Sequence, residues 1–332
     1  MDNSHLVMVL HRYKTQLVIS VLLGILLAAF MAASPGTFLR WGIYESFLST
    51  IPFFAIPAIA MTLVVVCGEM DMCFPSTIAM SGFVFSWLWT ATGKPILSVA
   101  GALCVGTVIG WTHGLIVVRI GVPSIIATIG TQFFWRGLLM VLCSGLAIDL
   151  AGIRESSLYH VFVGRIAGHV SAQALWAAGI AVIAGLLLNR HVFGDSLRFI
   201  GDNTETALKM GVPVSRVRIA VFTLMGFFCA ISGIIACVEM GSWWPTQGEG
   251  YLLLVFASVF IGGTSVFGGV GSIYGTCIGA VIIGIVEAGI ISAGYSGFWT
   301  RTVYGIIIVA SVSLYVVMSK SRPRISARQT SH

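Results

Sequence analysis

Charged side chains are scarce in this sequence. Only 9% of its 332 residues are Asp, Glu, Lys or Arg, whereas 57% are hydrophobic. A soluble domain has about 25% charged residues. The composition therefore excludes an ordinary cytosolic enzyme, a disordered chain, a disulfide scaffold and a nucleic-acid-binding protein.

Motifs for metal and nucleotide binding are also missing. None of the seven cysteines forms a C-x-x-C pair, and no Cys/His cluster has the spacing of a zinc site. There is no G-x-x-x-x-G-K-[ST] loop, and no run of intramembrane acids of the kind that a proton relay uses. We expect no catalytic residue, no metal site and no cofactor in this chain, so an energy source would belong to a partner.

Long apolar runs are abundant. About 20 apolar residues in a helix cross a bilayer, whereas barrel strands are shorter and alternate in polarity, which these runs do not. The first run could also be a signal peptide, but the many runs that follow favour an uncleaved helix. We predict an all-α polytopic membrane protein, a single transmembrane domain over 1–332, with about ten helices near 17–33, 46–66, 74–90, 96–118, 124–145, 171–188, 219–240, 250–267, 272–292 and 302–318.

Lysine and arginine suggest the orientation. With the N-terminus in the cytoplasm, twelve of the eighteen basic residues lie inside and five outside, and Arg136 remains within the fifth span. Cytoplasmic loops carry the excess of Lys and Arg in membrane proteins. We therefore expect cytoplasmic termini (1–16 and the basic tail 319–332), a cytoplasmic loop over 189–218 and an external loop over 146–170.

A short helix is predicted in the centre of the 189–218 loop. Asp202, Asn203 or Thr204 can cap its N-terminus, and Glu205 and Lys209 stand in the favourable i,i+4 order. Gly211 can end it, and Pro213 can open the next helix. Such a helix is too short to be stable alone. It is either a solvated surface helix or an element that docks on a cytoplasmic partner, with Ala207, Leu208 and Met210 as its apolar contacts.

Polar residues interrupt the apolar spans at several places. A charged side chain in mid-span is costly, so Arg136 should either form an ion pair or face a translocation pathway. We consider four acids as its ion-pair partners: Glu69, Asp71, Glu239 and Glu287. The stretch 67–75 breaks spans two and three with two acids, a glycine and a proline, which suggests non-helical backbone beside a translocation path. The stretch 241–251 is expected outside, as an aromatic interface belt or part of a substrate entrance. Gly271, Gly275 and Gly279 predict close helix contacts.

Three stretches resemble the permease subunits of bacterial ABC importers of the ribose, arabinose, xylose and autoinducer-2 type. They are Val122–Thr131 with Arg136-Gly-Leu138, then Phe199–Val212, and Pro245–Tyr251 followed by Val259–Ser272. Two places depart from the family. Only Gly68, Asp71 and Ser76 match its usual Gly-Ile-Asp-Leu-Ser-Val-Gly-Ser pattern, and Leu252–Leu254 stand where relatives tend to keep polar or acidic residues.

The resemblance implies a non-catalytic inner-membrane subunit that moves a small polar solute, such as a sugar. It implies three kinds of partner: cytoplasmic ATPases that bind ATP and Mg²⁺, a periplasmic binding protein, and a second copy or a paralogous permease. By this resemblance, the ATPase-coupling residues would be Asn203, Thr204, Glu205, Ala207, Leu208, Lys209 and Gly211. The translocation pathway or gate would include Asp71, Thr131, Gln132, Arg136, Trp243, Trp244 and Gln247.

Other functions stay open on the sequence alone. Nucleoside and amino-acid permeases of ABC importers are more distant relatives of the same family. An ion-coupled secondary transporter would depend on one of the acids Glu69, Asp71, Glu239 or Glu287. A channel or a structural membrane protein would need neither an ATPase nor a binding protein.

Overall fold

The computed structural model describes residues 3–166 and 168–320, with side chains for 16–166, 168–310 and 313. Parts of the expected cytoplasmic termini, including the side chains of Arg12, Lys14 and Lys320, lie outside this description. The long helices are α1 (Asn3–Ala33), α4 (Pro52–Val66), α5 (Phe74–Thr92), α6 (Pro95–Leu115), α7 (Ser124–Cys143), α9 (Ala172–Arg190), α12 (Val214–Met240), α14 (Ile273–Ser292) and α15 (Phe298–Lys320).

Shorter elements connect these helices. The helical ones are α2 (Pro35–Phe38), α3 (Trp41–Thr50), a π-helical turn η1 (Ile116–Ile120), a 3₁₀ turn η2 (Ile153–Glu155), α8 (Ser157–Phe162), α10 (Val192–Asp202), α11 (Thr204–Lys209) and α13 (Tyr251–Ile261). Two antiparallel ribbons pair β1 (Ile148–Asp149) with β4 (Ser242–Trp243), and β2 (Arg165–Ile166) with β3 (Val170–Ser171).

Six helices of the described chain are long and apolar enough to cross a membrane, and the pair α3–α4, bent by 50°, makes a seventh if it is counted as one span. The all-α polytopic class is confirmed, but the count of about ten is not. Helices do form at the third and tenth expected spans, as α5 and α15, without belonging to those six. The prediction of an eighth spanning helix at 250–267 is wrong. The helix there, α13, has 11 residues, about 16 Å, which is half of what a bilayer core requires.

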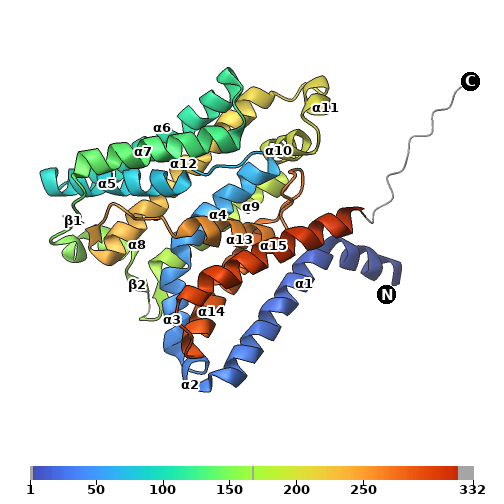
Figure 1. The fold of residues 1–332 in the computed structure, drawn as a ribbon, viewed down its shortest axis with the longest axis horizontal. Helices are drawn as coiled ribbons and strands as arrows, with labels where there is room; N and C mark the ends of the chain where they lie inside the picture. Colours follow the sequence, from blue (N-terminus) through green and yellow to red (C-terminus); the bar gives the residue numbers. More distant parts are fainter. Residues whose placement is uncertain (1–2, 167, 321–332) are drawn as a thin grey trace, which may run out of the picture.

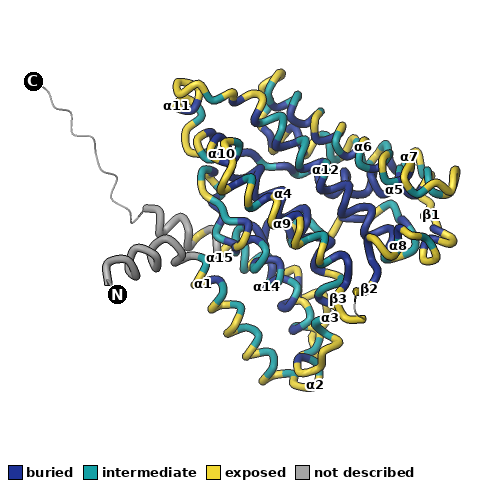
Figure 2. The backbone as a smooth tube through the Cα atoms, turned by 180° about the vertical axis from the view of Figure 1, so that it is seen from behind, coloured by how far each residue is buried: buried dark blue, intermediate teal, exposed yellow. Residues whose placement is uncertain are grey.

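Two helices form the centre of the molecule. Every residue of α4 is buried, and so are 83% of the residues in the most apolar stretch of α12. Figure 2 shows these buried segments in the middle, with more exposed helices around them.

Glycines of α14 let α13 approach it closely. A Cβ on Gly275 would lie 2.0 Å from the Gly262 carbonyl oxygen, and one on Gly279 would lie 2.3 Å from the Ser258 carbonyl oxygen. The close contacts predicted for these two glycines are confirmed.

The connecting segments gather at two opposite ends. At one end lie α10, α11 and the segments 67–73 and 262–272, where the Gly269 N–H donates to the Val66 carbonyl at 2.9 Å. At the other end lie α8 and both ribbons, where the Leu150 N–H donates to the Gly241 carbonyl at 2.9 Å (Figure 1). The loops expected inside thus share one end, and those expected outside share the other.

Candidate functional site

The backbone leaves the helical conformation between α4 and α5. Gly68 has φ of +81°, a conformation that glycine adopts without strain. Two N–H groups of the segment 67–73 are bonded by side chains of α7: Met70 donates to Ser124 Oγ at 3.2 Å and Met72 to Thr128 Oγ1 at 2.9 Å. The interruption predicted at 67–75 is therefore present over 67–73, and two of its N–H groups are satisfied by side chains of the protein.

Asp71 points into the protein from this segment. Its Oδ1 accepts the Cys73 N–H at 2.7 Å, and its Oδ2 lies 3.5 Å from Nδ1 of His113 on α6. Asp71 and His113 are each 1% exposed. This contact places the interrupted segment against α6. We did not anticipate His113; a lone histidine within an apolar span was its only signal in the sequence.

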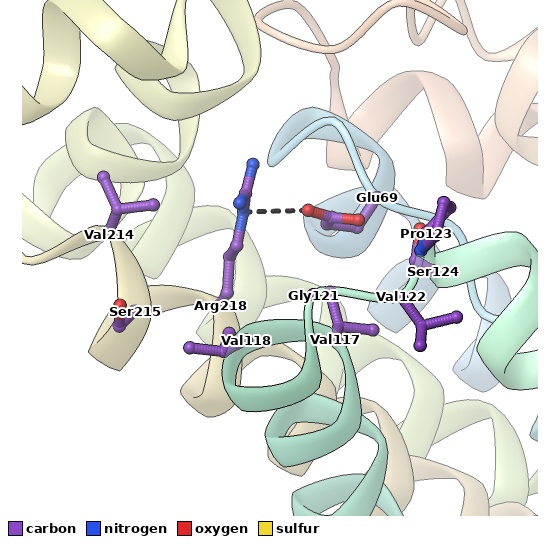
Figure 3. Close-up of a pocket in the computed structure, with 10 residues that line it drawn as sticks. All are labelled: Glu69, Val117, Val118, Gly121, Val122, Pro123, Ser124, Val214, Ser215 and Arg218. Atoms are coloured by element: carbon purple, nitrogen blue, oxygen red, sulfur yellow. Dashed lines mark ion pairs between the residues drawn. The ribbon is translucent and has the colours of Figure 1, made fainter.

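A cavity of about 320 Å³ lies at the same end of the bundle. Figure 3 shows Arg218, from the second turn of α12, reaching across it toward Glu69. Arg218 Nε lies 2.8 Å from Glu69 Oε1, and its second amino group donates to Thr204 Oγ1 on α11 at 3.1 Å. The rest of the lining comes from η1, from the turn before α7 and from the start of α12.

The short helix predicted around 204–210 is confirmed as α11. Asn203 Oδ1 accepts the Thr206 N–H at 2.9 Å, and the Lys209 ammonium lies 2.8 Å from Glu205 Oε1. Gly211 has φ of +80°, and Pro213 directly precedes α12. We did not expect the helix α10 before it, although Leu197 and Ile200, three positions apart and both buried, mark its inner face.

The three apolar residues of this helix separate by exposure. Ala207 is 1% exposed and faces the bundle, whereas Leu208 and Met210 are 57% and 61% exposed. Of the apolar contacts predicted for this helix, Ala207 is therefore the one that packs against the bundle. Leu208 and Met210 remain as the surface that a partner can reach, and we call them the exposed apolar pair.

Arg136 has partners other than those we considered. Its guanidinium donates to the Pro245 carbonyl and, at 3.3 Å, to that of Gln247, and it lies 3.9 Å from Glu249. Each of the four acids proposed as its partner has another partner: Glu69 has Arg218, Asp71 has His113, Glu239 accepts from Gln173, and Glu287 accepts from Tyr304.

The segment before α13 enters the bundle rather than lying on its outer surface. Trp243 and Gln247 are fully buried; the indole N–H donates to the Ala79 carbonyl at 2.9 Å, and the Gln247 amide to that of Gly233 at 3.2 Å. Trp243 lies in β4, at the end of the molecule expected outside, but Trp243 and Gln247 are buried within the protein rather than exposed on its surface, while Trp244 is partly exposed. This segment and the short α13 stand where a single spanning helix was expected, and we call them the second interrupted crossing.

One polar stripe on α7 contacts both interrupted segments. Ser124, Thr128, Gln132 and Arg136 stand four residues apart, so they share one face of the helix. The first two bond the segment 67–73, the Gln132 carbonyl accepts from Ser76 at 3.0 Å, and Arg136 bonds the segment 245–249. Thr131, also expected in the pathway, lies beside this stripe and is partly exposed. The regular spacing was visible in the sequence, and we missed it.

Comparison with known proteins gives one family. Residues 43–312 match the model of the branched-chain amino acid transport system / permease component. The chain is 32% identical over 260 residues to the ribose import permease protein RbsC of Escherichia coli strain K12, covering 78% of this chain and 80% of that protein.

Two arabinose proteins are similar as well. The L-arabinose ABC transporter permease protein AraH of Azospirillum brasilense is 29% identical over 293 residues, which is 88% of this chain and 85% of the relative. The L-arabinose transport system permease protein AraH of Escherichia coli strain K12 is 32% identical over 263 residues, covering 77% of this chain and 79% of the relative. No solved structure matches the chain.

Proposed function

Because the chain belongs to the branched-chain amino acid transport system / permease component family, we propose that it is the membrane subunit of an ATP-driven importer for a sugar of the ribose or arabinose class. The observation that carries this proposal is the similarity to ribose and arabinose permeases over more than three quarters of the chain. The match spans both interrupted segments and the stretch that forms α10 and α11.

The importer's ATPase would dock on α10 and α11. Leu208 and Met210 are exposed apolar side chains on a segment rich in charge, and Phe199 on α10 is 46% exposed. Apolar side chains that gather outside the membrane-spanning part need a protein partner to cover them. In this arrangement Asn203 and Gly211 set the two ends of α11, and Glu205 and Lys209 stabilise it between them.

A pathway between two subunits fits the filled centre of the bundle. The side chains of α4 and the inner part of α12 are buried against neighbours, which leaves a solute no room to pass between them. In helix α7, by contrast, only 17% of the residues in the most apolar stretch are buried. We propose that a second copy or a paralogous permease packs beside the chain to form the pathway, and that a periplasmic binding protein delivers the solute at the end of α8 and the ribbons.

The orientation follows from the positive-inside rule. The end that carries α10 and α11 holds Arg190, Arg198, Arg216 and Arg218, and we propose that it faces the cytoplasm of a bacterial inner membrane. Both termini would lie on that side. The chain would catalyse no reaction itself, with ATP and Mg²⁺ bound by the ATPase, whose nucleotide state would favour one of two arrangements of the helices.

Reconstitution tests this function. The chain, the ATPase and the binding protein encoded with it would be purified as a complex and placed in vesicles with ATP on the cytoplasmic face. We expect saturable uptake of labelled ribose or L-arabinose that requires both ATP and the binding protein. Uptake of leucine or a nucleoside instead would reassign the solute. Concentrative uptake by the chain alone would contradict the proposal and support an ion-coupled transporter.

A further inference from the structure

Arg218 lies between two segments that are distant in the sequence. On one side is Glu69 in the interrupted segment, and on the other is Thr204, the first residue of α11. The Glu69 side chain is 9% exposed and that of Arg218 is 26% exposed. Because these side chains are largely shielded from water, the attraction between their charges is stronger than in a surface pair. Removal of one partner leaves the other charge uncompensated.

Thr204 anchors this contact to the whole α10–α11 unit. Its hydroxyl donates to the Ile200 carbonyl of α10 at 3.0 Å while it accepts from Arg218. One hydroxyl therefore joins the last turn of α10, the first turn of α11 and the guanidinium. Because the docking surface proposed above lies on the same two short helices, a displacement of that surface also displaces the Arg218 contact.

The residues that follow Glu69 connect it to α7. The next residue, Met70, donates its N–H to Ser124, and Met72 donates to Thr128 one turn further along α7. A shift of Glu69 therefore strains the two bonds that hold the segment 67–73. These bonds belong to the polar stripe of α7, which ends at Arg136 and the second interrupted crossing.

A close backbone contact joins α10 to the start of the interrupted segment. Gly201 packs against Val66 and Gly68, where a Cβ on Gly201 would lie 2.0 Å from the Val66 carbonyl oxygen. Two glycine backbones can slide past each other without a rotamer change. The Arg218–Glu69 ion pair adds a charged contact from α12 to the same segment, and the cavity of about 320 Å³ beside it leaves space for the guanidinium to move.

We propose that Arg218 is a positioning residue for transport: its ion pair with Glu69 and its bond to Thr204 transmit the movement of α11 to the segment 67–73 and so to α7. This inference rests on the proposed function. Breaking the pair then uncouples ATP hydrolysis from uptake, because the ATPase still docks on Leu208 and Met210 while the interrupted segment no longer follows.

The test uses the complete transporter in vesicles and measures solute taken up per ATP hydrolysed. The variants are Glu69→Gln, Arg218→Gln, the conservative Arg218→Lys, and the charge exchange Glu69→Arg with Arg218→Glu. The control is Glu45→Gln, which removes the carboxylate that pairs with the exposed side chains of Arg165 and His169 at the opposite end. Coupling free energies between sites correspond to about 5- to 150-fold changes, so we expect uptake per ATP to fall at least fivefold in both Gln variants.

The expected pattern separates transmission from stability. ATP hydrolysis stays within about twofold of the unsubstituted complex, whereas Arg218→Lys and the charge exchange regain much of the uptake per ATP. The inference is overturned if the Gln variants keep normal uptake per ATP. It is also overturned if hydrolysis, uptake and folded yield fall together and neither charge-keeping variant restores the ratio, since the pair would then be merely structural.

The unsubstituted complex tells the two proposals apart. If it shows no ATP-dependent uptake, the importer function fails and this inference fails with it. If it couples normally and the Gln variants do as well, the importer stands and only the role of Arg218 is lost.

Discussion

Gly226 on α12 and Gly106 on α6 meet backbone to backbone. A Cβ added to Gly226 would lie 2.0 Å from the Gly106 carbonyl oxygen, and one added to Gly106 would lie 2.6 Å from that of Gly226. Without side chains at the crossing, the central helix approaches its neighbour closely enough for dispersion contacts along both helices. Such contacts drive helix association in lipid, where apolar burial gives no advantage.

The first prediction concerns this crossing. We expect Gly226→Ala to destabilise the protein by about 1–3 kcal/mol, because an overpacked contact between two backbones has no flexible atom to yield. Thermal unfolding of the purified protein in detergent would be the measurement. The control is Gly179→Ala on α9, where an added Cβ meets nothing within 4 Å. Equal melting temperatures for the two variants would contradict the crossing described here.

The second prediction concerns Arg136. We expect Arg136→Ala to lower stability by about 1–3 kcal/mol, because the Pro245 and Gln247 carbonyls would lose their donor inside the bundle. Thermal unfolding and the folded yield report this loss. Arg154→Ala, at an exposed arginine of η2, serves as the control. An Arg136→Ala protein that melts like the control would show that the second interrupted crossing is held by other contacts.

The third prediction concerns the exposed apolar pair. Replacing Leu208 and Met210 by serine removes apolar surface from the proposed docking site, and we expect about tenfold weaker binding of the partner ATPase, which equals about 1.4 kcal/mol. The affinity of detergent-purified components measures it. Val161→Ser, at a residue that is 52% exposed at the opposite end, is the matched control. Unchanged affinity in the double variant would move the docking surface elsewhere.

The fourth prediction concerns the cap of α11. We expect Asn203→Ala to weaken the helix by about 1 kcal/mol, since the Thr206 N–H loses its acceptor. Hydrogen exchange at the Thr206 and Ala207 amides should accelerate about fivefold, while Asn203→Ser, which keeps an acceptor, should stay near the original rate. Equal protection in the alanine and serine variants would indicate that α11 is held by its tertiary contacts alone.

Local features were predictable because neighbouring residues decide them. The cap at Asn203, the Glu205–Lys209 pair and the turn at Gly211 depend on residues within one or two helical turns, and all three are present. The break at 67–73 was also visible, because two acids and a glycine between apolar runs do not suit a continuous span.

Features that depend on distant residues were missed. Arg136 bonds carbonyls more than one hundred positions away, and no pattern near either residue identifies the other. Trp243 and Gln247 have the polar composition of a loop, yet they are buried because their polar atoms reach the Ala79 and Gly233 carbonyls. The helix α13 has only 11 residues, and β4 precedes it where a longer helix was expected.

The amino-acid sequence alone determined that this chain belongs in a membrane, since apolar content and run length depend on no contact. It also determined the family, because three stretches of consecutive residues carry the resemblance. Only the tertiary structure decided which polar groups pair inside the bundle, and which face of α11 is free. Those outcomes depend on helices that meet across the fold, where each buried polar group must find whatever partner the geometry brings within reach.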